Sequence, residues 1–212
     1  MKRDLPLADF VQVHEHLRWN DALGIGIGSP AQEAIYNISY WNKYRRYDAD
    51  LLGKALTKAR KAFVETHAPK RYGVLLDVGI GGGLFCYAIN CHGYDVNPYA
   101  VHMLKQAQRW HDPWLMPVES ATFWDSLEHM NEPELMLENV CKYVFVSMPI
   151  YRNVDHCLHS KHFRPHEHVW YFTRDGFVRW MLNRGFVLLA ESDFEIDLGR
   201  EDIYSFAFMR KP

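Results

Sequence analysis

The chain has 212 residues, 48% of them hydrophobic and 24% charged, which suits one globular domain. Its net charge of −2 argues against a broadly basic surface for nucleic acid, and no apolar run is long enough for a membrane span. The four cysteines (Cys86, Cys91, Cys141 and Cys157) form no CxxC pair, so we expect reduced thiols and a cytoplasmic protein.

Residues 1–70 predict a helical extension. Apolar residues recur at helical spacing from Leu7 to Leu17, and the glycine-rich stretch 23–30 reads as a loop because no clear strand precedes it. A second helix begins near Asp48 and ends before Pro69. Between these segments lies an aromatic row: Tyr36, Tyr40, Trp41, Tyr44 and Tyr47. This row either packs against the domain or forms a lid over a ligand.

Residues 71–212 alternate between strand and helix patterns, which predicts a doubly wound α/β domain. The expected strands span residues 74–78, 92–96, 121–125, 143–148, 186–190 and 203–209, with residues 110–117 unassigned and 149–170 a long polar connection. No helix separates the last two strands, so they should pair antiparallel. We therefore expect a Rossmann-like, seven-stranded, mostly parallel sheet with an antiparallel last strand.

A glycine-rich turn at residues 74–85 is the strongest signal in the chain. An aliphatic run ends at Asp77, glycines follow at alternate positions, and a helix can start near Leu84. Glycine permits unusual backbone angles and close ligand contact, and helix-start N–H groups suit an anionic group. The turn therefore predicts a nucleotide-type pocket built on Asp77, Gly79, Ile80, Gly81 and Gly83.

The spacing D-x-G-x-G-x-G resembles motif I of class I S-adenosylmethionine-dependent methyltransferases. The order of motifs is also similar to that of phage-encoded and prophage-encoded members. The resemblance implies S-adenosylmethionine as cofactor, with Asp77 near its methionine end. We therefore expect an N-terminal helical extension over residues 1–70 and a cofactor-binding domain over residues 71–212.

Asp95 ends the second expected strand, eighteen residues after Asp77. An acid at this place can accept both hydroxyls of a ribose. A simple turn or helix-start aspartate is the alternative. Because the segment Gly93–Pro98 resembles the second motif of the family, Asp95, Val96 and Asn97 join the predicted cofactor site.

The segment Asp125–His129 resembles the D-x-L-E-H stretch of small-molecule methyltransferases. The resemblance implies that the backbone near Asp125 and Ser126 faces the cofactor and makes His129 a catalytic candidate. Glu128 and His129 can instead form a hydrogen-bonded pair that shapes the loop.

Residues 155–168 contain five histidines and Cys157. Such side chains can hold zinc, but paired CxxC or HExxH spacing is missing and Pro165 interrupts the segment, so we expect no metal there. By resemblance, this loop covers the methyl-transfer centre, where His162, Glu167 or His168 orients or deprotonates the acceptor. A structural His–Glu network is the alternative.

The resemblance as a whole implies methyl transfer by in-line displacement to a small-molecule or modest acceptor. A nucleic-acid methyltransferase is less favoured, because the D/N-P-P-Y/F motif is missing and Asn97-Pro98-Tyr99 follows the wrong strand. A non-catalytic cofactor-binding module or a dinucleotide oxidoreductase is the remaining alternative. The turn Gly199–Asp202 should form charge pairs at the surface.

Overall fold

The protein is described by a computed structural model over residues 5–29, 36–68 and 73–212. Six strands form the central sheet, in the order β5 (His92–Tyr94), β4 (Leu75–Val78), β6 (Val118–Trp124), β7 (Val140–Tyr151), β10 (Ile203–Arg210) and β9 (Phe186–Ser192). Strands β5, β4, β6 and β7 pair in parallel, whereas β10 runs antiparallel to both β7 and β9. The predicted α/β class, the mostly parallel sheet and the antiparallel last strand are confirmed.

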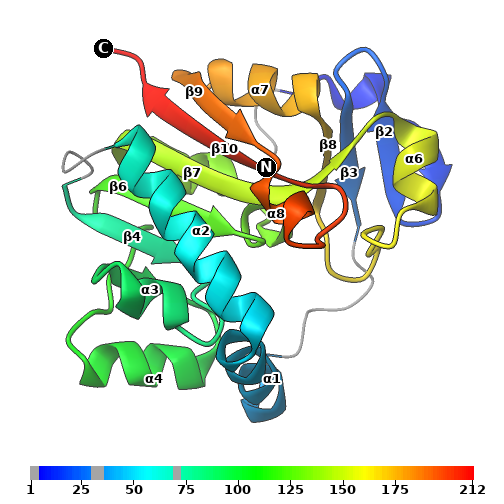
Figure 1. The fold of residues 1–212 in the computed structure, drawn as a ribbon. Helices are drawn as coiled ribbons and strands as arrows, with labels where there is room; N and C mark the ends of the chain where they lie inside the picture. The colour runs from blue at the N-terminus through cyan, green and yellow to red at the C-terminus, as the bar shows by residue number, and fades with distance from the viewer. Residues whose placement is uncertain (1–4, 30–35, 69–72) are drawn as a thin grey trace.

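Helices cover both faces of this sheet, because successive side chains of a strand point to opposite sides. Phe145 and Ala207 pack on one face, with α2 (Leu51–His67), α3 (Leu84–Ala88) and α4 (Pro98–Gln106). Their neighbours Val144, Val146 and Phe206 pack on the other, with α5 (Pro133–Glu138) and α7 (Arg174–Leu182). Figure 1 shows α2 crossing in front of the strands.

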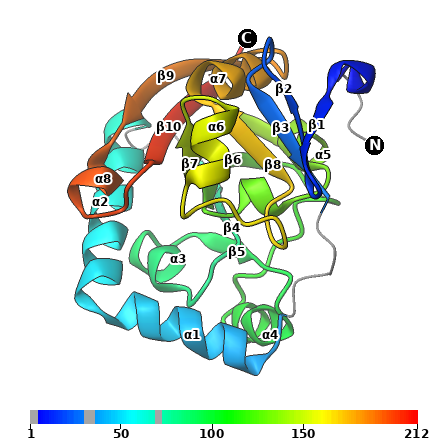
Figure 2. The ribbon, with the colours of Figure 1, turned by 90° about the vertical axis from the view of Figure 1, so that its right-hand side faces the viewer.

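The expected helical start of the chain is wrong. After a short 3₁₀ turn, η1 (Leu7–Asp9), the chain forms three antiparallel strands, β1 (Val11–His14), β2 (Leu17–Asn20) and β3 (Ile25–Gly28). Strand β3 pairs with β8 (Trp170–Thr173), which runs parallel to the end of β7. The described residues therefore form a ten-stranded sheet rather than a seven-stranded one, and Figure 2 shows the added strands beside β8.

Packing explains this difference. Leu17 and Trp19 alternate with Arg18 at strand spacing and are buried beside Tyr151 and Tyr171. The stretch that we expected to be a glycine-rich loop contains strand β3 instead. Its Gly26 packs against Trp19, and an ideal Cβ on Gly26 would come within 2.5 Å of the Trp19 ring. Long-range burial thus outweighs the weak pattern of four-residue segments.

The helical part of the extension agrees better with expectation. Helices α1 (Ile38–Ala49) and α2 carry the aromatic row and the amphipathic pattern. The polar connection after β7 contains a helix that was not expected, α6 (Val154–His159). None of the helices in the described part of the chain is long and apolar enough to cross a membrane.

Candidate functional site

The glycine loop, residues 79–83, leaves the carboxyl end of β4. Gly79, Gly81 and Gly83 have φ angles of 78°, 57° and 92°, in the left-handed region that favours glycine. At Gly79, an ideal Cβ would lie 2.7 Å from Cβ of Ser126. The Ser126 hydroxyl donates a 2.6 Å hydrogen bond to the carbonyl of Val78, so the segment after β6 packs directly against the loop.

Asp77 lies beneath the glycine loop as a buried acid with 1% of its surface exposed. Its Oδ1 accepts a 2.8 Å hydrogen bond from the hydroxyl of Thr122 on β6. Burial raises the pKa of Asp77 to about 7, although the Thr122 hydrogen bond and Arg60 oppose the shift. The ionised form of this carboxyl is therefore costly, and a nearby positive group would stabilise it.

Asp95, at the end of β5, points toward the same loop. Its Oδ1 accepts a 2.8 Å hydrogen bond from the N–H of Asn97. Burial raises the pKa of Asp95 to about 6, although the nearby backbone N–H groups of Asn97, Gly81, Val96 and Ile80 favour its ionised form. The structure thus brings both predicted acids and the glycine loop together. Val96 is exposed beside them.

Asn97 has a structural task next to these groups. Its Oδ1 accepts a 3.0 Å hydrogen bond from the N–H of Tyr99 and so caps α4. Its Nδ2 donates to the carbonyl of Asn37 at 3.3 Å. The Asn97 side chain therefore ties α4 to the entrance of α1.

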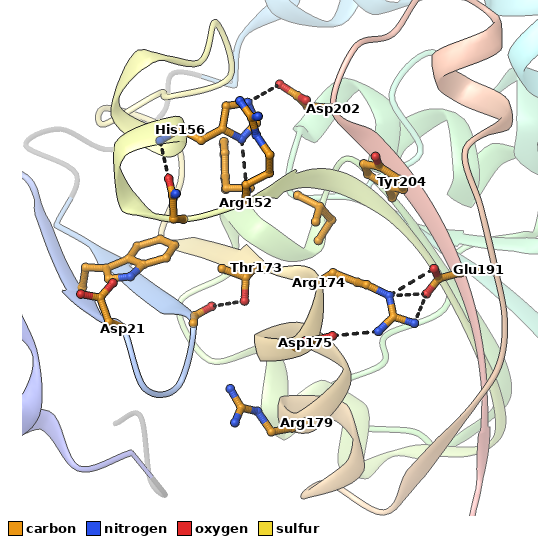
Figure 3. Close-up of a pocket in the computed structure, with 15 residues that line it drawn as sticks. Asp21, Arg152, His156, Thr173, Arg174, Asp175, Arg179, Glu191, Asp202 and Tyr204 are labelled. Atoms are coloured by element: carbon orange, nitrogen blue, oxygen red, sulfur yellow. Dashed lines mark hydrogen bonds and ion pairs between the residues drawn. The ribbon is translucent and has the colours of Figure 1, made fainter.

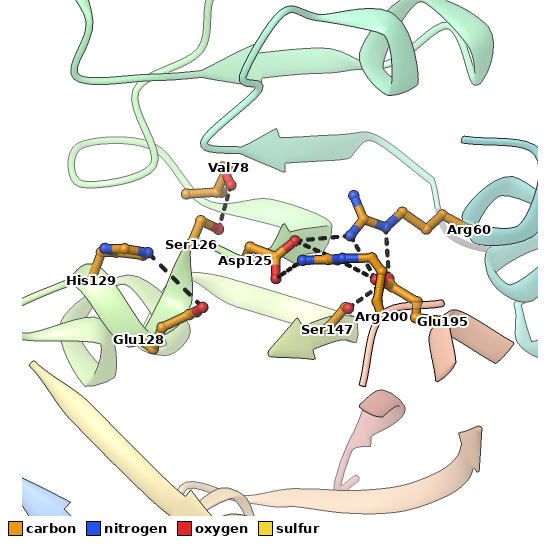
Figure 4. A network of polar contacts seen from close by, with 9 residues as sticks. All are labelled: Arg60, Val78, Asp125, Ser126, Glu128, His129, Ser147, Glu195 and Arg200. Atoms are coloured by element: carbon orange, nitrogen blue, oxygen red, sulfur yellow. Dashed lines mark hydrogen bonds and ion pairs between the residues drawn. The ribbon is translucent and has the colours of Figure 1, made fainter. Parts of the chain in front are cut away.

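Asp125 joins a network of charges that Figure 4 shows from close by. Arg200 donates to both carboxylate oxygens at 2.8 and 2.9 Å, and Arg60 donates to one of them at 3.0 Å. Both arginines also bond Glu195, which is fully buried and accepts a 2.6 Å hydrogen bond from Ser147. Burial favours neutral Asp125, but the two arginines outweigh it and lower its pKa. The Asp125 side chain is thus occupied, and its backbone N–H donates a 2.8 Å hydrogen bond to the carbonyl of Ser147.

The side chain of Arg200 lies elsewhere than we expected from the sequence. We expected the turn 199–202 to form only surface charge pairs, and two of its acids do so, Glu201 with Lys161 and Asp202 with His156. The Arg200 side chain, 22% exposed, turns inward to Asp125 instead. Arg60 and Glu195 were also missed, because no local motif marks partners that lie 65 to 135 positions apart.

Helix α1 covers the outer side of the glycine loop and contacts α3 and α4, as Figure 2 also shows. Asp48 accepts a 2.9 Å hydrogen bond from the N–H of Leu84, the first residue of α3. An ideal Cβ on Gly82 would lie 2.5 Å from Oδ2 of Asp48 and 2.8 Å from Cα of Arg45. The aromatic row thus reaches the predicted cofactor site at Tyr44, which lies against Gly81.

His129 and His168 meet on the other side of Asp125. Their ring centroids are 4.6 Å apart, and the two rings are nearly perpendicular. His129 follows Glu128 on η2 (Leu127–His129), and its Nδ1 donates to the carbonyl of Glu167 at 3.2 Å. Burial lowers the pKa of both histidines and raises that of Glu128 well above its ordinary value.

The other two catalytic candidates point elsewhere. His162 donates from Nε2 to the carbonyl of Glu201 at 2.8 Å. The Glu167 carboxylate pairs with Arg164 at 3.1 Å on the surface, and only its backbone reaches His129. Of the four candidates, His129 and His168 therefore form the one close pair of side chains.

A separate depression of about 660 Å³ lies where the ends of β7, β8 and α7 meet (Figure 3). Two pairs of its charged groups bond each other: Arg174 bonds Glu191 at 2.7 Å, and His156 bonds Asp202 at 3.2 Å. Arg179 donates to the carbonyls of Ala22 and Leu23. None of the predicted site residues lines this depression.

Comparison with known proteins adds a family and a fold. No curated protein matches the chain. Among solved structures, magnesium protoporphyrin IX methyltransferase from Synechocystis, crystallised with S-adenosylhomocysteine, superposes with a TM-score of 0.58 at 11% identity, over 83% of this chain and 96% of that chain. A 1,6-didemethyltoxoflavin-N1-methyltransferase from Burkholderia thailandensis gives 0.53 at 13% identity, over 93% and 100%.

A (4+2) cyclase also superposes, with a TM-score of 0.53 at 17% identity over 72% of this chain and 79% of that chain. At such low identities these likenesses show the fold alone. A family model described as a methyltransferase domain matches residues 41–191, a span that contains the glycine loop, Asp95 and the segment 125–129. The chain belongs to this methyltransferase-domain family.

Proposed function

We propose that this protein is an S-adenosylmethionine-dependent methyltransferase that acts on a small-molecule acceptor. The observation that carries the proposal is the contact between the glycine loop and the end of β5: the N–H of Gly79 donates a 2.8 Å hydrogen bond to the carbonyl of Tyr94, the residue before Asp95. This contact joins the acid, the bare backbone of the glycine loop and buried Asp77 into one site at neighbouring strand ends. Ligands of open α/β sheets bind at such strand ends.

The residues present suit this cofactor. Asp95 can accept the two ribose hydroxyls, and the glycine loop allows the ligand to approach the backbone. The methionine end carries a positive amino group, which would relieve the cost of ionising buried Asp77. The ribose hydroxyls and the amino group of the cofactor would thus each find a carboxylate.

When bound, S-adenosylmethionine supplies an activated methyl group on a sulfonium, so the protein mainly has to align the acceptor and exclude water. We propose that α1 acts as the lid: Tyr44 lies against Gly81, and its hydroxyl is 3.2 Å from that of Tyr40. On the far side of Asp125, His129 and His168 remain the candidates for orienting or deprotonating the acceptor.

A small acceptor is favoured over nucleic acid. The net charge of −2 offers no general attraction to phosphates. The names of the two methyltransferases reported above give a porphyrin and a toxoflavin precursor as their substrates, which supports the same class for this protein. Turnover of S-adenosylmethionine with a panel of metabolites and with nucleic acid would separate the two classes.

The binding test is calorimetry with S-adenosylhomocysteine. We expect the wild type to bind, and Asp95→Asn to bind at least tenfold more weakly, because hydrogen bonds to a charged acceptor contribute about 1.5–3 kcal/mol. Asp155→Asn is the matched control, since this acid is 84% exposed on α6. Equal affinity of the wild type and Asp95→Asn would reject the ribose assignment, and no binding by the wild type would reject the proposed function.

A further inference from the structure

Three metal-ligating side chains converge beside Asp125. One ligand atom from each of Glu128, His129 and His168 lies within 4.8 Å of the other two. Glu128 and His129 belong to η2, whereas His168 comes from the loop before β8. The backbone N–H of Val169 donates a 2.8 Å hydrogen bond to the carbonyl of Glu128 and holds the two segments together.

The orientation of His129 suits a ligand. Because a carbonyl oxygen can only accept, the hydrogen bond from Nδ1 to Glu167 places the ring proton on Nδ1. The lone pair of Nε2 then points toward Glu128, whose Oε1 is 4.0 Å away. Histidines that bind metals commonly donate their second ring N–H to a carbonyl or carboxylate in this way.

Glu128 supplies an independent observation. Its surface is 2% exposed, and its Oε2 has no hydrogen-bond partner among the residues that the structure describes. A buried, unpaired polar oxygen costs about 1–3 kcal/mol, so native proteins rarely keep one without a reason. A cation bound between Glu128 and the two imidazoles would satisfy this oxygen.

We propose that Glu128, His129 and His168 bind one divalent transition-metal ion, with Zn²⁺ the best match. Two imidazole nitrogens and one carboxylate are the ligands of catalytic zinc sites that keep a position open for water or substrate. Donor atoms in a tetrahedral zinc site lie roughly 3.4 Å apart, given bonds of about 2.0–2.2 Å. The three donors would therefore move inward by roughly 1 Å on binding.

The role of the ion rests on the proposed function. The triad lies beside the segment Asp125–Ser126, next to the predicted cofactor site, so the open metal position would take an oxygen of the acceptor. Coordination to the metal would lower the pKa of the acceptor's hydroxyl group, and the hydroxyl proton would pass to the solvent. That oxygen would then form its bond to the methyl carbon while the sulfur–methyl bond breaks and leaves its electron pair on sulfur. The acceptor class is therefore a hydroxyl compound that can bind a metal.

The test titrates chelator-treated, full-length protein with Zn²⁺ by calorimetry and with Co²⁺ by visible absorption. We expect one ion per chain, with ligand-field bands for Co²⁺. Glu128→Gln, His129→Gln and His168→Gln should each lower the affinity at least tenfold. His102→Gln, which changes an exposed histidine on α4, should leave the affinity unchanged.

The outcomes separate the two proposals. A folded wild type that binds neither ion, or ligand variants that bind as tightly as the wild type, would overturn the metal site. If a variant unfolds by circular dichroism, the stoichiometry and Co²⁺ spectrum of the wild type decide instead. Binding of S-adenosylhomocysteine by the metal-free protein is measured in parallel. If the metal-free protein does not bind S-adenosylhomocysteine, the proposed function fails. If it binds S-adenosylhomocysteine but takes up neither Zn²⁺ nor Co²⁺, only the metal site fails.

Discussion

Asp77→Asn should stabilise the ligand-free protein at neutral and alkaline pH. Asp77 is 1% exposed, and its pKa rises from an ordinary 3.8 to about 7, mainly through burial. The shift spans roughly three pKa units, and each unit corresponds to about 1.36 kcal/mol. Ionised Asp77 therefore costs about 4 kcal/mol of folding free energy at pH 8. Asparagine keeps the oxygen that accepts the Thr122 hydrogen bond without carrying the charge.

The sign follows from proton linkage. A carboxyl with a raised pKa holds its proton more tightly in the folded state. Its favourable contribution to folding stability is therefore fully present below pH 3.8. This stability is lost as the pH rises to about 7. Urea unfolding at pH 4 and pH 8 checks this. The advantage of Asp77→Asn should be about 4 kcal/mol at pH 8 and below about 1 kcal/mol at pH 4. An equal or smaller advantage at pH 8 would refute the burial argument.

Two further predictions concern neighbouring charges. Arg60→Met removes one cation from fully buried Glu195 and should lower the free energy of unfolding by about 3 kcal/mol, because it leaves a buried charge undercompensated. Adding Glu195→Gln to that variant should restore part of the loss in urea unfolding, and no recovery would contradict the pairing. Separately, calorimetry should find that affinity for S-adenosylhomocysteine falls roughly tenfold from pH 7 to pH 5, as Asp95, with a pKa of about 6, takes up a proton. A fall of the same size in Asp95→Asn would assign the effect to another group.

The glycine loop and the acids around it could be predicted because their chemistry is local. Gly79, Gly81 and Gly83 need φ angles that other residues avoid, and such positions are visible in a single short stretch. Asp95 was predictable for the same reason, since it follows a strand at the place where α/β folds bind ligands. Asn97 and Thr173 cap α4 and α7 with their side chains, and such caps are short-range features as well.

The charge network and the histidine pair depend on contacts between distant parts of the chain. Arg200 reaches Asp125 across 75 positions. His168 reaches His129 where hydrogen bonds from Val169 to Glu128 and from His129 to Glu167 join the two segments. His162 shares the same loop, but it turns to Glu201. Residue types in a histidine-rich loop therefore do not reveal which of them will meet.

Strand β7 takes part in three pairings: with β6, with β10 along most of its length, and with β8 at Ile150 and Tyr151. Strand β3 protects the outer side of β8. A shortened version of the protein that lacked the first three strands would leave the edge of β8 that pairs with β3 without a partner, and an unpaired edge can pair with a strand of another chain. An amino-terminal truncation that removes these strands should therefore aggregate, even if the predicted cofactor site stays intact.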